Sequence, residues 1–506
     1  MLSFSARTRA ANLARMAQDR FDVLVIGGGI TGAGIALDAA ARGFSVAVIE
    51  KDDFASGTSG RSSRLVHGGL RYLEHREFGL VRESLRERGL LFRLAPHLIR
   101  PVPMYMLADD RRGRTRYGAG LAIYDLLAAG RNIGVHRSVD AEQVRRAMPG
   151  LAAPSRGYRC FEGQTDDARL TLEVARAAQA FGAVLANHVR AEALLGSARV
   201  AGAVAADTMT GERFEILAQV TVNAAGVWAD QVFGAEGRLR PSKGVHVVFA
   251  PGAVRTGAAL AVPSAAGDGR YVFLVPWENR VYAGTTDTPY SGDLDHPAVE
   301  DSDRDYILAT VARYFPGVTE RDVVASWAGL RPLLSQDGAE TADLSRKHVI
   351  FDDPPGLFTI TGGKLTTYRA MAEDLVNRIS GWLGPRGRCS TGSIPLGLHG
   401  PVGPALGLAT AEAARLGLPP GTGARLVQLY GDDWPEAIRL IGQDPSLGEP
   451  AVDGLPVLNV ELNLARNREM AITTEDVFVR RTRLTTREAS VRWPGAVTPS
   501  GGSASG

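Results

Sequence analysis

Residues 21–51 contain the pattern that most constrains how this chain can fold: a strand, a glycine-rich turn, a helix and a second strand. The run 23–26 is short, apolar and mostly β-branched, which is typical of a parallel strand covered on both faces. Gly27, Gly29 and Gly32 follow in the spacing G-x-G-x-x-G. The first glycine allows a tight turn, the second lets backbone approach a pyrophosphate, and the third lets the helix pack closely on the strand.

The ends of this unit indicate what it binds. A helix that begins after Gly29 directs unpaired amide groups and its positive dipole end toward an anion. The second predicted strand, 45–49, ends at Glu50, whose carboxylate can accept hydrogen bonds from ribose hydroxyls. Together these features predict a dinucleotide site, and a βαβ crossover without a ligand is the alternative.

Bulk composition limits the other possibilities. A chain of 506 residues is too long for one core, so we expect two or three domains. The net charge of +2 gives no overall attraction to nucleic acid. Cys160 and Cys389 lack metal-ligand spacing, so we expect free thiols in a reducing cytosol and no metal site.

No segment is apolar enough to span a membrane, and residues 1–20 lack the apolar core of a signal peptide. We expect those residues to form a solvated surface helix, with a basic arm on anionic lipid as the alternative.

A loop rich in serine, threonine and glycine follows Glu50. Thr58, Ser59, Ser62 and Ser63 can offer hydroxyls to the pyrophosphate and ribitol of a long cofactor, whereas a flexible linker is the alternative. His67 then precedes two glycines, which can place an imidazole close to a flat ring, although a lone histidine is more often structural. An amphipathic helix is predicted over 77–94.

Later segments repeat the pattern of a strand that stops at small residues. The run 220–230 ends a buried strand at Ala225 and Gly226, where backbone can again approach a cofactor. Gly363 breaks another strand, and a helix that begins near Thr366 would direct its N-terminus at the same place. From residue 243 onward, β-rich runs separated by turns predict an antiparallel sheet in a second domain, with the active site between the two domains.

With these residues in view, the chain resembles the FAD-dependent glycerol-3-phosphate dehydrogenases over nearly its whole length. The motifs that carry the resemblance occur in the family's order: IGGGITGAGIALDAAARG, SSRLVHGGLRYLE, NAAGVW, GTTD, WAGLRPL, GGKLTTYR and EDVFVRRTRL. The resemblance implies an amino-acid-oxidase-type flavoprotein of the α/β class. Such a protein has a Rossmann-like FAD-binding domain, an antiparallel β-sheet substrate domain and a C-terminal helical domain.

The expected domain boundaries follow from the pattern and the resemblance together. They are an N-terminal arm (1–20), a discontinuous FAD-binding domain (21–100, 155–240 and 325–385), a substrate-binding domain (101–154 and 241–324), a C-terminal helical domain (386–500) and a disordered tail (501–506).

The implied activity is oxidation of sn-glycerol 3-phosphate to dihydroxyacetone phosphate, with FAD as the hydride acceptor. The resemblance also implies a quinone as electron acceptor, peripheral attachment to the cytoplasmic face of the membrane, and a homodimer. Oxygen as the acceptor, an amine or amino-acid oxidase on the same fold, and a flavin-binding module without catalysis are the alternatives.

Substrate phosphate calls for arginine, whose planar fork grips phosphate oxygens, with lysine as a point charge. Arg331, Arg346 and Arg71 are the candidates that the resemblance places in the substrate pocket, and Tyr72, which directly follows Arg71, is a further candidate. We expect His67 to accept the hydroxyl proton, with His246 as the second candidate. Lys364 is expected to stabilise the reduced flavin, with a phosphate contact as the alternative.

The candidate cofactor-binding residues are Gly27, Gly29, Gly32, Glu50, Lys51, Thr58, Ser59, Ser62, Ser63, His67, Gly68, Gly69, Ala225, Gly226, Gly363, Lys364, Leu365 and Thr366.

Overall fold

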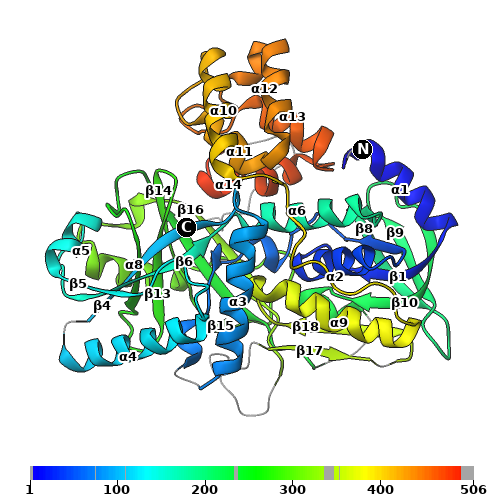
Figure 1. Ribbon diagram of the computed structural model, residues 1–506, viewed down its shortest axis with the longest axis horizontal. Coiled ribbons are helices and arrows are strands. Elements are labelled where there is room, and N and C mark those ends of the chain that lie inside the picture. The colour runs from blue at the N-terminus through cyan, green and yellow to red at the C-terminus, as the bar shows by residue number, and fades with distance from the viewer. Residues whose placement is uncertain are drawn as a thin grey trace, which may run out of the picture.

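The computed structural model describes residues 4–73, 76–108, 110–232, 237–335, 347–352 and 354–491. Its strands form two sheets that lie side by side, and the C-terminal helices form a separate layer above them (Figure 1). This arrangement confirms the predicted fold class, with a Rossmann-like sheet, a largely antiparallel second sheet and a helical C-terminal part.

The first sheet is built around the βαβ unit that the glycine pattern predicts. Strand β1 pairs in parallel with β2 on one side and with β10 on the other, which buries residues 21–26. Helix α2 packs between α6 and α9, and their apolar faces share one core with β1. In spatial order the strands are β17 (His348–Phe351), β18 (Leu357–Gly362), β10 (Arg213–Asn223), β1 (Arg20–Ile26), β2 (Val46–Ile49) and β7 (Val184–Ala186), with β9 (Gly202–Asp207) and β8 (Val189–Leu195) attached through β10. The helices are α2 (Ile30–Ala41), α6 (Asp167–Ala180), α7 (Ala229–Val232) and α9 (Tyr368–Leu383).

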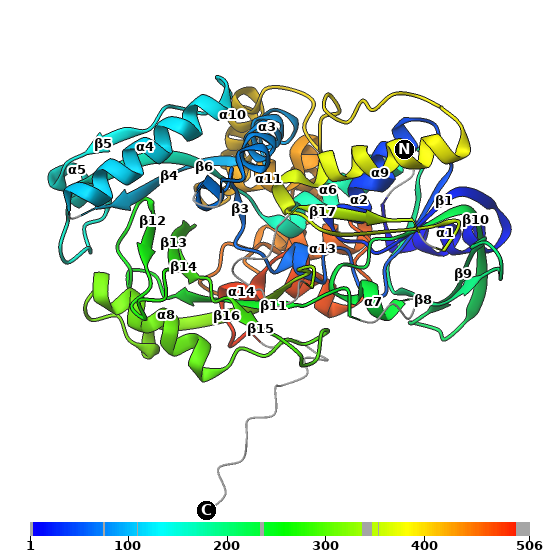
Figure 2. The ribbon, with the colours of Figure 1, turned by 90° about the horizontal axis from the view of Figure 1, so that it is seen from below.

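Among the described residues, the second sheet holds ten strands and is antiparallel apart from the pair β4 and β12. In order they are β15 (Thr288–Pro289), β11 (Ser242–Phe249), β14 (Arg280–Gly284), β13 (Tyr271–Trp277), β12 (Ala259–Pro263), β4 (Arg100–Leu107), β6 (Gly157–Gln164) and β3 (Leu65–Val66), with β16 (Val323–Arg331) on β11 and β5 (Arg137–Val139) on β6. The helices beside it are α3 (Phe78–Leu94), α4 (Arg111–Ala128), α5 (Ala141–Ala147) and α8 (Asp301–Tyr314). Viewed from below, α3, α4 and α5 lie along one side of this half and α8 along the other (Figure 2).

Three strands of the second sheet lie wholly or mostly in ranges predicted for the FAD-binding domain: β3, β6 and β16. Their chain segments therefore cross between the two sheets, and the domain boundaries remain a prediction.

The N-terminal segment is packed on the first sheet instead of forming a separate arm. Helix α1 (Ala6–Gln18) begins at a capping box on Ser5 and buries Met16. The Arg9 guanidinium pairs with Asp207 at 2.7 Å, and the Asn12 amide donates to the carbonyl of Leu185. These buried polar contacts oppose release of the helix as a free basic arm.

The C-terminal helices have a core of their own. Helices α10 (Val402–Arg415), α11 (Thr422–Tyr430), α12 (Trp434–Gln443) and α13 (Asn459–Arg468) enclose apolar residues such as Leu426, Ile438 and Leu464. A π-helical turn, η8 (Asp476–Arg481), and α14 (Leu484–Arg487) follow and lie at the base of this layer, against the two sheets (Figure 1). The predicted tail at 501–506 lies outside the described residues.

Candidate active site

Two adjoining cavities, of about 300 and 530 Å³, lie where the two sheets meet. The smaller one, which we call the dinucleotide cavity, is lined by the glycine turn after β1, by the loop after β2 and by the ends of β10, β16 and β18. The larger one, the second cavity, is mostly apolar and lies between β4, β12, β13 and the segment around α4. His67, Tyr72 and Arg331 line both cavities, so they mark the place where the two meet.

The glycine turn has the close packing that its spacing predicts. Gly27 has φ +118°, and a Cβ on Gly32 would lie 1.9 Å from the carbonyl oxygen of Gly27, so both positions exclude a side chain. Gly29 is the N-cap of α2, and a Cβ there would meet only the hydroxyl of Ser59, at 3.1 Å. Gly29 is therefore the glycine whose open side faces the cavity.

Glu50 is buried beside this turn and is already hydrogen bonded. Its carboxylate accepts from the amide of Gly28 at 2.7 Å and from the amide of Asp52 at 2.9 Å. Burial raises the pKa of Glu50 to about 7, although both backbone hydrogen bonds act to lower it. A ribose hydroxyl would give this carboxylate a further donor.

The raised pKa of Glu50 predicts that FAD affinity depends on pH. In the predicted complex ribose hydroxyls would donate to the carboxylate and lower its pKa, so FAD should bind more tightly as the pH rises toward about 7 and level off above it. The FAD-free protein should lose stability over the same rise, since its folded state favours the neutral acid. Titration of the apoprotein with FAD at several pH values checks this. Glu50→Gln should flatten the curve, and a flat curve in the parent protein would rule the linkage out.

The loop after β2 uses its hydroxyls mainly to hold itself in place. Thr58 donates to the carbonyl of Leu330 at 2.6 Å, and Ser62 donates to Asp167 at 2.6 Å. Ser59 Oγ accepts from the amide of Ile30, the first residue of α2, at 2.9 Å. All three residues line the dinucleotide cavity, and direct contacts of their hydroxyls with a cofactor remain a prediction.

His67 follows β3 and is held through its backbone. Its amide donates to Thr366 Oγ1 at 3.3 Å, and the next amide, that of Gly68, donates to the hydroxyl of Tyr124 at 2.9 Å. The side chain is half-buried and lines both cavities. The segment therefore presents an imidazole where the cavities join.

His246 lies in a different environment. Its ring stacks on Trp327 with centroids 4.7 Å apart, and Nε2 lies 2.9 Å from Ser63 Oγ. Burial, together with the positive charges of Arg331 and Arg64, lowers the pKa of His246 to about 3. A base with so low a pKa is a weak proton acceptor at neutral pH, which favours His67 over His246 for that role.

Arg331 and Lys364 bring positive charge to the junction. Arg331 pairs with Asp287 at 3.3 Å and donates to Thr285 Oγ1 at 3.0 Å, so its fork is fixed in orientation. Lys364 Nζ lies 3.8 Å from the ring centroid of Tyr72 and donates to Ser84 Oγ at 3.1 Å. Ser84, Thr285 and Asp287 were not predicted as site residues. The GTTD tract contains the last two, and it was the only sequence signal for them.

Most of the predicted residues line the dinucleotide cavity, and a few do not. Gly69 lines the second cavity only. Gly32 and Gly68 line neither cavity and are closely packed behind the residues that do. Arg346 lies outside the described residues, and the side chain of Arg71 is likewise not described. The predicted residues that line the dinucleotide cavity are Gly27, Gly29, Glu50, Lys51, Thr58, Ser59, Ser62, Ser63, His67, Tyr72, Ala225, Gly226, His246, Arg331, Gly363, Lys364, Leu365 and Thr366.

The cavity fits the flavin dinucleotide that the sequence predicts. It is lined by Gly29 at the N-terminus of α2, by the buried carboxylate of Glu50, and by Gly226, a second place where the backbone can approach a ligand closely. Within the described part of the chain, the buried indole Nε1 of Trp228, another lining residue, has no hydrogen-bond partner. Lys51 Nζ lies 4.2 Å from the ring centroid of the same indole. A bound ligand would supply the missing acceptor.

Comparisons with known proteins agree with this geometry. A family model described as FAD dependent oxidoreductase matches residues 22–378, and one described as the C-terminal domain of alpha-glycerophosphate oxidase matches residues 389–493. The chain is 39% identical over 489 residues to glycerol-3-phosphate dehydrogenase 2 of Mycobacterium tuberculosis, covering 94% of this chain and 83% of the relative. It is 33% identical over 562 residues to alpha-glycerophosphate oxidase of Streptococcus pneumoniae, covering 95% and 91%.

A solved structure extends the similarity to three dimensions. The glycerol-3-phosphate dehydrogenase from Bacillus halodurans, complexed with FAD, superposes with a TM-score of 0.80 at 34% sequence identity, covering 96% of this chain and 90% of that one. The similarity therefore spans both sheets and the C-terminal helices.

Proposed function

The chain belongs to the family of FAD-dependent glycerol-3-phosphate dehydrogenases, and from this premise we propose that it oxidises sn-glycerol 3-phosphate to dihydroxyacetone phosphate. FAD is the cofactor of this family and, when bound, supplies the acceptor for the hydride that leaves C2 of the substrate. The protein must bind the phosphate, take the proton of the C2 hydroxyl and exclude water.

The observation that carries the proposal is the junction of the two cavities. His67 and Arg331 line both, so an imidazole and a guanidinium face the region between the dinucleotide site and the second cavity. In our proposal Arg331 holds the phosphate through its planar fork, and His67 accepts the hydroxyl proton. Lys364, fixed by Ser84, adds positive charge for the reduced flavin, with a phosphate contact as its alternative role.

Arg331→Ala should weaken substrate binding and leave FAD in place. Loss of a charge-assisted phosphate contact costs on the order of 1.5–3 kcal/mol, or roughly a 10- to 150-fold higher apparent KM for glycerol 3-phosphate. Steady-state kinetics on the flavin-loaded protein measures the change. Arg304→Ala is the control, because Arg304 is paired with Asp301 on α8 and lines neither cavity. An unchanged KM in Arg331→Ala would remove this residue from the phosphate site.

An amine or amino-acid oxidase on the same fold is the main competing function. Such an enzyme would use an arginine to bind a substrate carboxylate instead of a phosphate. Turnover with glycerol 3-phosphate and with a panel of amino acids separates the two, since our proposal requires activity with the phosphate ester alone.

For the electron acceptor we propose a quinone, as the sequence resemblance implies. Relatives named dehydrogenase and oxidase are both more than 30% identical to this chain, so their names leave the acceptor open. Parallel assays with a soluble quinone and with oxygen distinguish the two. Faster reoxidation by the quinone is the expected result.

A quinone acceptor would require contact with a membrane surface. None of the helices in the described ranges combines the length and apolar character needed to cross a bilayer. Peripheral attachment is supported by Phe78, Ile123 and Leu126, which are large apolar residues 44%, 41% and 78% exposed, with Arg111 and Arg112 exposed on the same helix α4 as the last two. Co-sedimentation with anionic vesicles tests this attachment. The predicted homodimer is tested by sedimentation equilibrium.

A further inference from the structure

The C-terminal segment carries a row of buried arginines that reach into other parts of the chain. Arg480 and Arg481 lie in η8, and Arg483 follows it; their side chains are 6%, 3% and 4% exposed. We call these three residues the arginine row. Residues 51–63, the loop that follows Glu50, are called the cofactor loop, because they join β2 to the wall of the dinucleotide cavity. The row and the loop are more than 400 residues apart in sequence.

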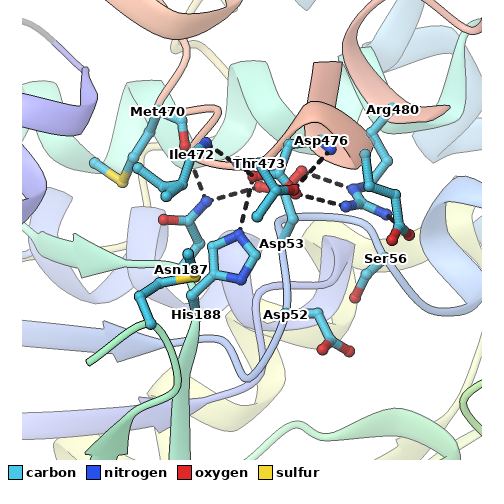
Figure 3. Close-up of polar contacts among 12 residues, drawn as sticks. Asp52, Asp53, Ser56, Asn187, His188, Met470, Ile472, Thr473, Asp476 and Arg480 are labelled. Carbon is cyan, nitrogen blue, oxygen red and sulfur yellow. Dashed lines mark hydrogen bonds and ion pairs between the residues drawn. The ribbon is translucent and has the colours of Figure 1, made fainter. Parts of the chain in front are cut away.

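The first half of the cofactor loop is held through Asp53, which is fully buried. Its carboxylate accepts from Arg480 Nε at 2.8 Å and from both terminal nitrogens of Arg481, at 2.5 and 2.9 Å. Asn187 donates a fourth hydrogen bond at 2.9 Å. In Figure 3, Asn187 and Arg480 are directed toward Asp53.

Backbone hydrogen bonds connect the segment around Asp53 to the glycine turn and to Glu50. Asp53 lies three residues after Glu50, and the amide of Ala55 donates to the carbonyl of Gly28 at 3.2 Å. Gly28 in turn donates its amide to Glu50. A displaced Asp53 would therefore move the backbone that sets the position of the Glu50 carboxylate.

His188 and Asp476 add a second link at the same place. Asp476 is fully buried, and its carboxylate accepts from the amides of Ile472 and Thr473 and contacts His188 Nε2 at 2.9 Å. The amide of His188 donates to the carbonyl of Asp52 at 2.6 Å. In Figure 3 the imidazole of His188 is directed at Asp476. The C-terminal segment is thus linked to the first half of the loop directly at Asp53 and, through His188, at Asp52.

The second half of the cofactor loop is held through Arg483. Its Nη1 donates to the carbonyl of Gly60 at 2.8 Å, and its other nitrogens pair with Asp166 and Asp167 at the start of α6. Asp167 also accepts from the amide and the hydroxyl of Ser62, at 2.9 and 2.6 Å. One guanidinium therefore ties the backbone of the loop to the helix that supports it.

We propose that the arginine row positions the cofactor loop for FAD, so that the C-terminal domain acts as a clamp on the FAD site. The inference rests on the proposed FAD-dependent function, which it deepens by giving the C-terminal domain a role. Within it, Arg480, Arg481 and Arg483 are positioning residues: they act through Glu50, Ser59 and Ser62 and contact loop atoms themselves. Buried charge pairs of this kind hold a geometry strongly, since removing one partner leaves the other unpaired and desolvated.

Arg487 provides a matched control on the same segment. It is as buried as the arginine row, but it pairs with Glu278 in the turn between β13 and β14, at 2.7 Å. Loss of Arg487 therefore removes an ion pair from the second sheet instead of from the cofactor loop, although its partner Glu278 is 30% exposed. A general loss of stability should follow the substitution of either Arg483 or Arg487, whereas a loss of FAD affinity should follow only the substitution of Arg483.

The test compares Arg483→Gln with Arg487→Gln. For each, the dissociation constant of FAD is measured by titrating the apoprotein, and thermal unfolding is followed with and without FAD. We expect Arg483→Gln to raise the FAD dissociation constant by about 10- to 100-fold, the loss typical of a charge-assisted hydrogen-bond network. Arg487→Gln should stay within about threefold of the parent while its FAD-free Tm falls at least as far.

Arg483→Lys keeps the proposal falsifiable if the glutamine variant does not fold. Lysine retains the charge but loses the fork, so the FAD dissociation constant should fall between those of the parent and the glutamine variant. Equal weakening of FAD in the Arg483 and Arg487 variants, or an unchanged constant in either Arg483 variant, would overturn the clamp. Because the readout is FAD binding, absence of glycerol 3-phosphate oxidation would contradict the proposed function and leave this comparison intact.

Discussion

His67→Gln is expected to slow anaerobic reduction of the bound flavin by glycerol 3-phosphate by about 10²- to 10⁴-fold, the usual effect of losing a positioned general base. Glutamine has a similar shape but cannot accept the C2 hydroxyl proton at neutral pH. FAD content and substrate affinity should change much less, because the segment around residue 67 is held through its backbone to Thr366 and Tyr124. Stopped-flow absorbance measures the rate.

Two further measurements sharpen this result. The reduction rate of the parent protein should rise with pH through one ionisation, and this dependence should be lost in His67→Gln. His246→Gln is the comparison, because the buried His246 ring, with a pKa lowered to about 3, is already neutral over the working range. A parental reduction rate in His67→Gln would place the base elsewhere, and a large loss in His246→Gln would point to that residue.

Gly29→Val is expected to give a folded protein that carries no flavin. The added side chain would extend from the N-cap of α2 into the space predicted for the pyrophosphate, and its first carbon would meet only Ser59. The parent should copurify with FAD, not NAD, because the cofactor loop and the strand that ends at Gly226 extend the site beyond the first motif. Visible absorbance of the purified proteins and far-ultraviolet circular dichroism measure flavin content and folding.

Gly381→Val provides the control for substitution of a glycine. Gly381 lies within α9, and a Cβ there would have no neighbour within 4 Å. This variant should keep its flavin. Full flavin loading in Gly29→Val would mean that the pyrophosphate does not approach the chain at the glycine turn.

The part of the fold that the sequence predicts correctly is the part with local signals. The strand at 23–26, the glycines and the helix that follows form a unit whose contacts span about thirty residues, so pattern and spacing suffice. The helix predicted over 77–94 is α3, and the glycine break at 362–363 ends β18.

Long-range pairing accounts for what the sequence did not predict. The sequence of β6 has the pattern of an ordinary strand, and only its pairing with β3, β4 and β5 places it in the second sheet. The fixed orientation of Arg331 depends on Asp287, which lies 44 residues earlier. The arginine row appears in the sequence as part of a basic motif, whereas its partner Asp53 lies 428 residues away from Arg481. No periodicity connects residues at such separations, so only the folded chain reveals these contacts.

The most direct test of the account is an anaerobic titration of the purified protein with glycerol 3-phosphate, followed by the visible absorbance of its flavin. The account predicts that the phosphate ester bleaches the flavin, that dihydroxyacetone phosphate is formed in equal amount, and that amino acids cause no change. It would be contradicted if glycerol 3-phosphate left the flavin oxidised while an amine or amino acid reduced it.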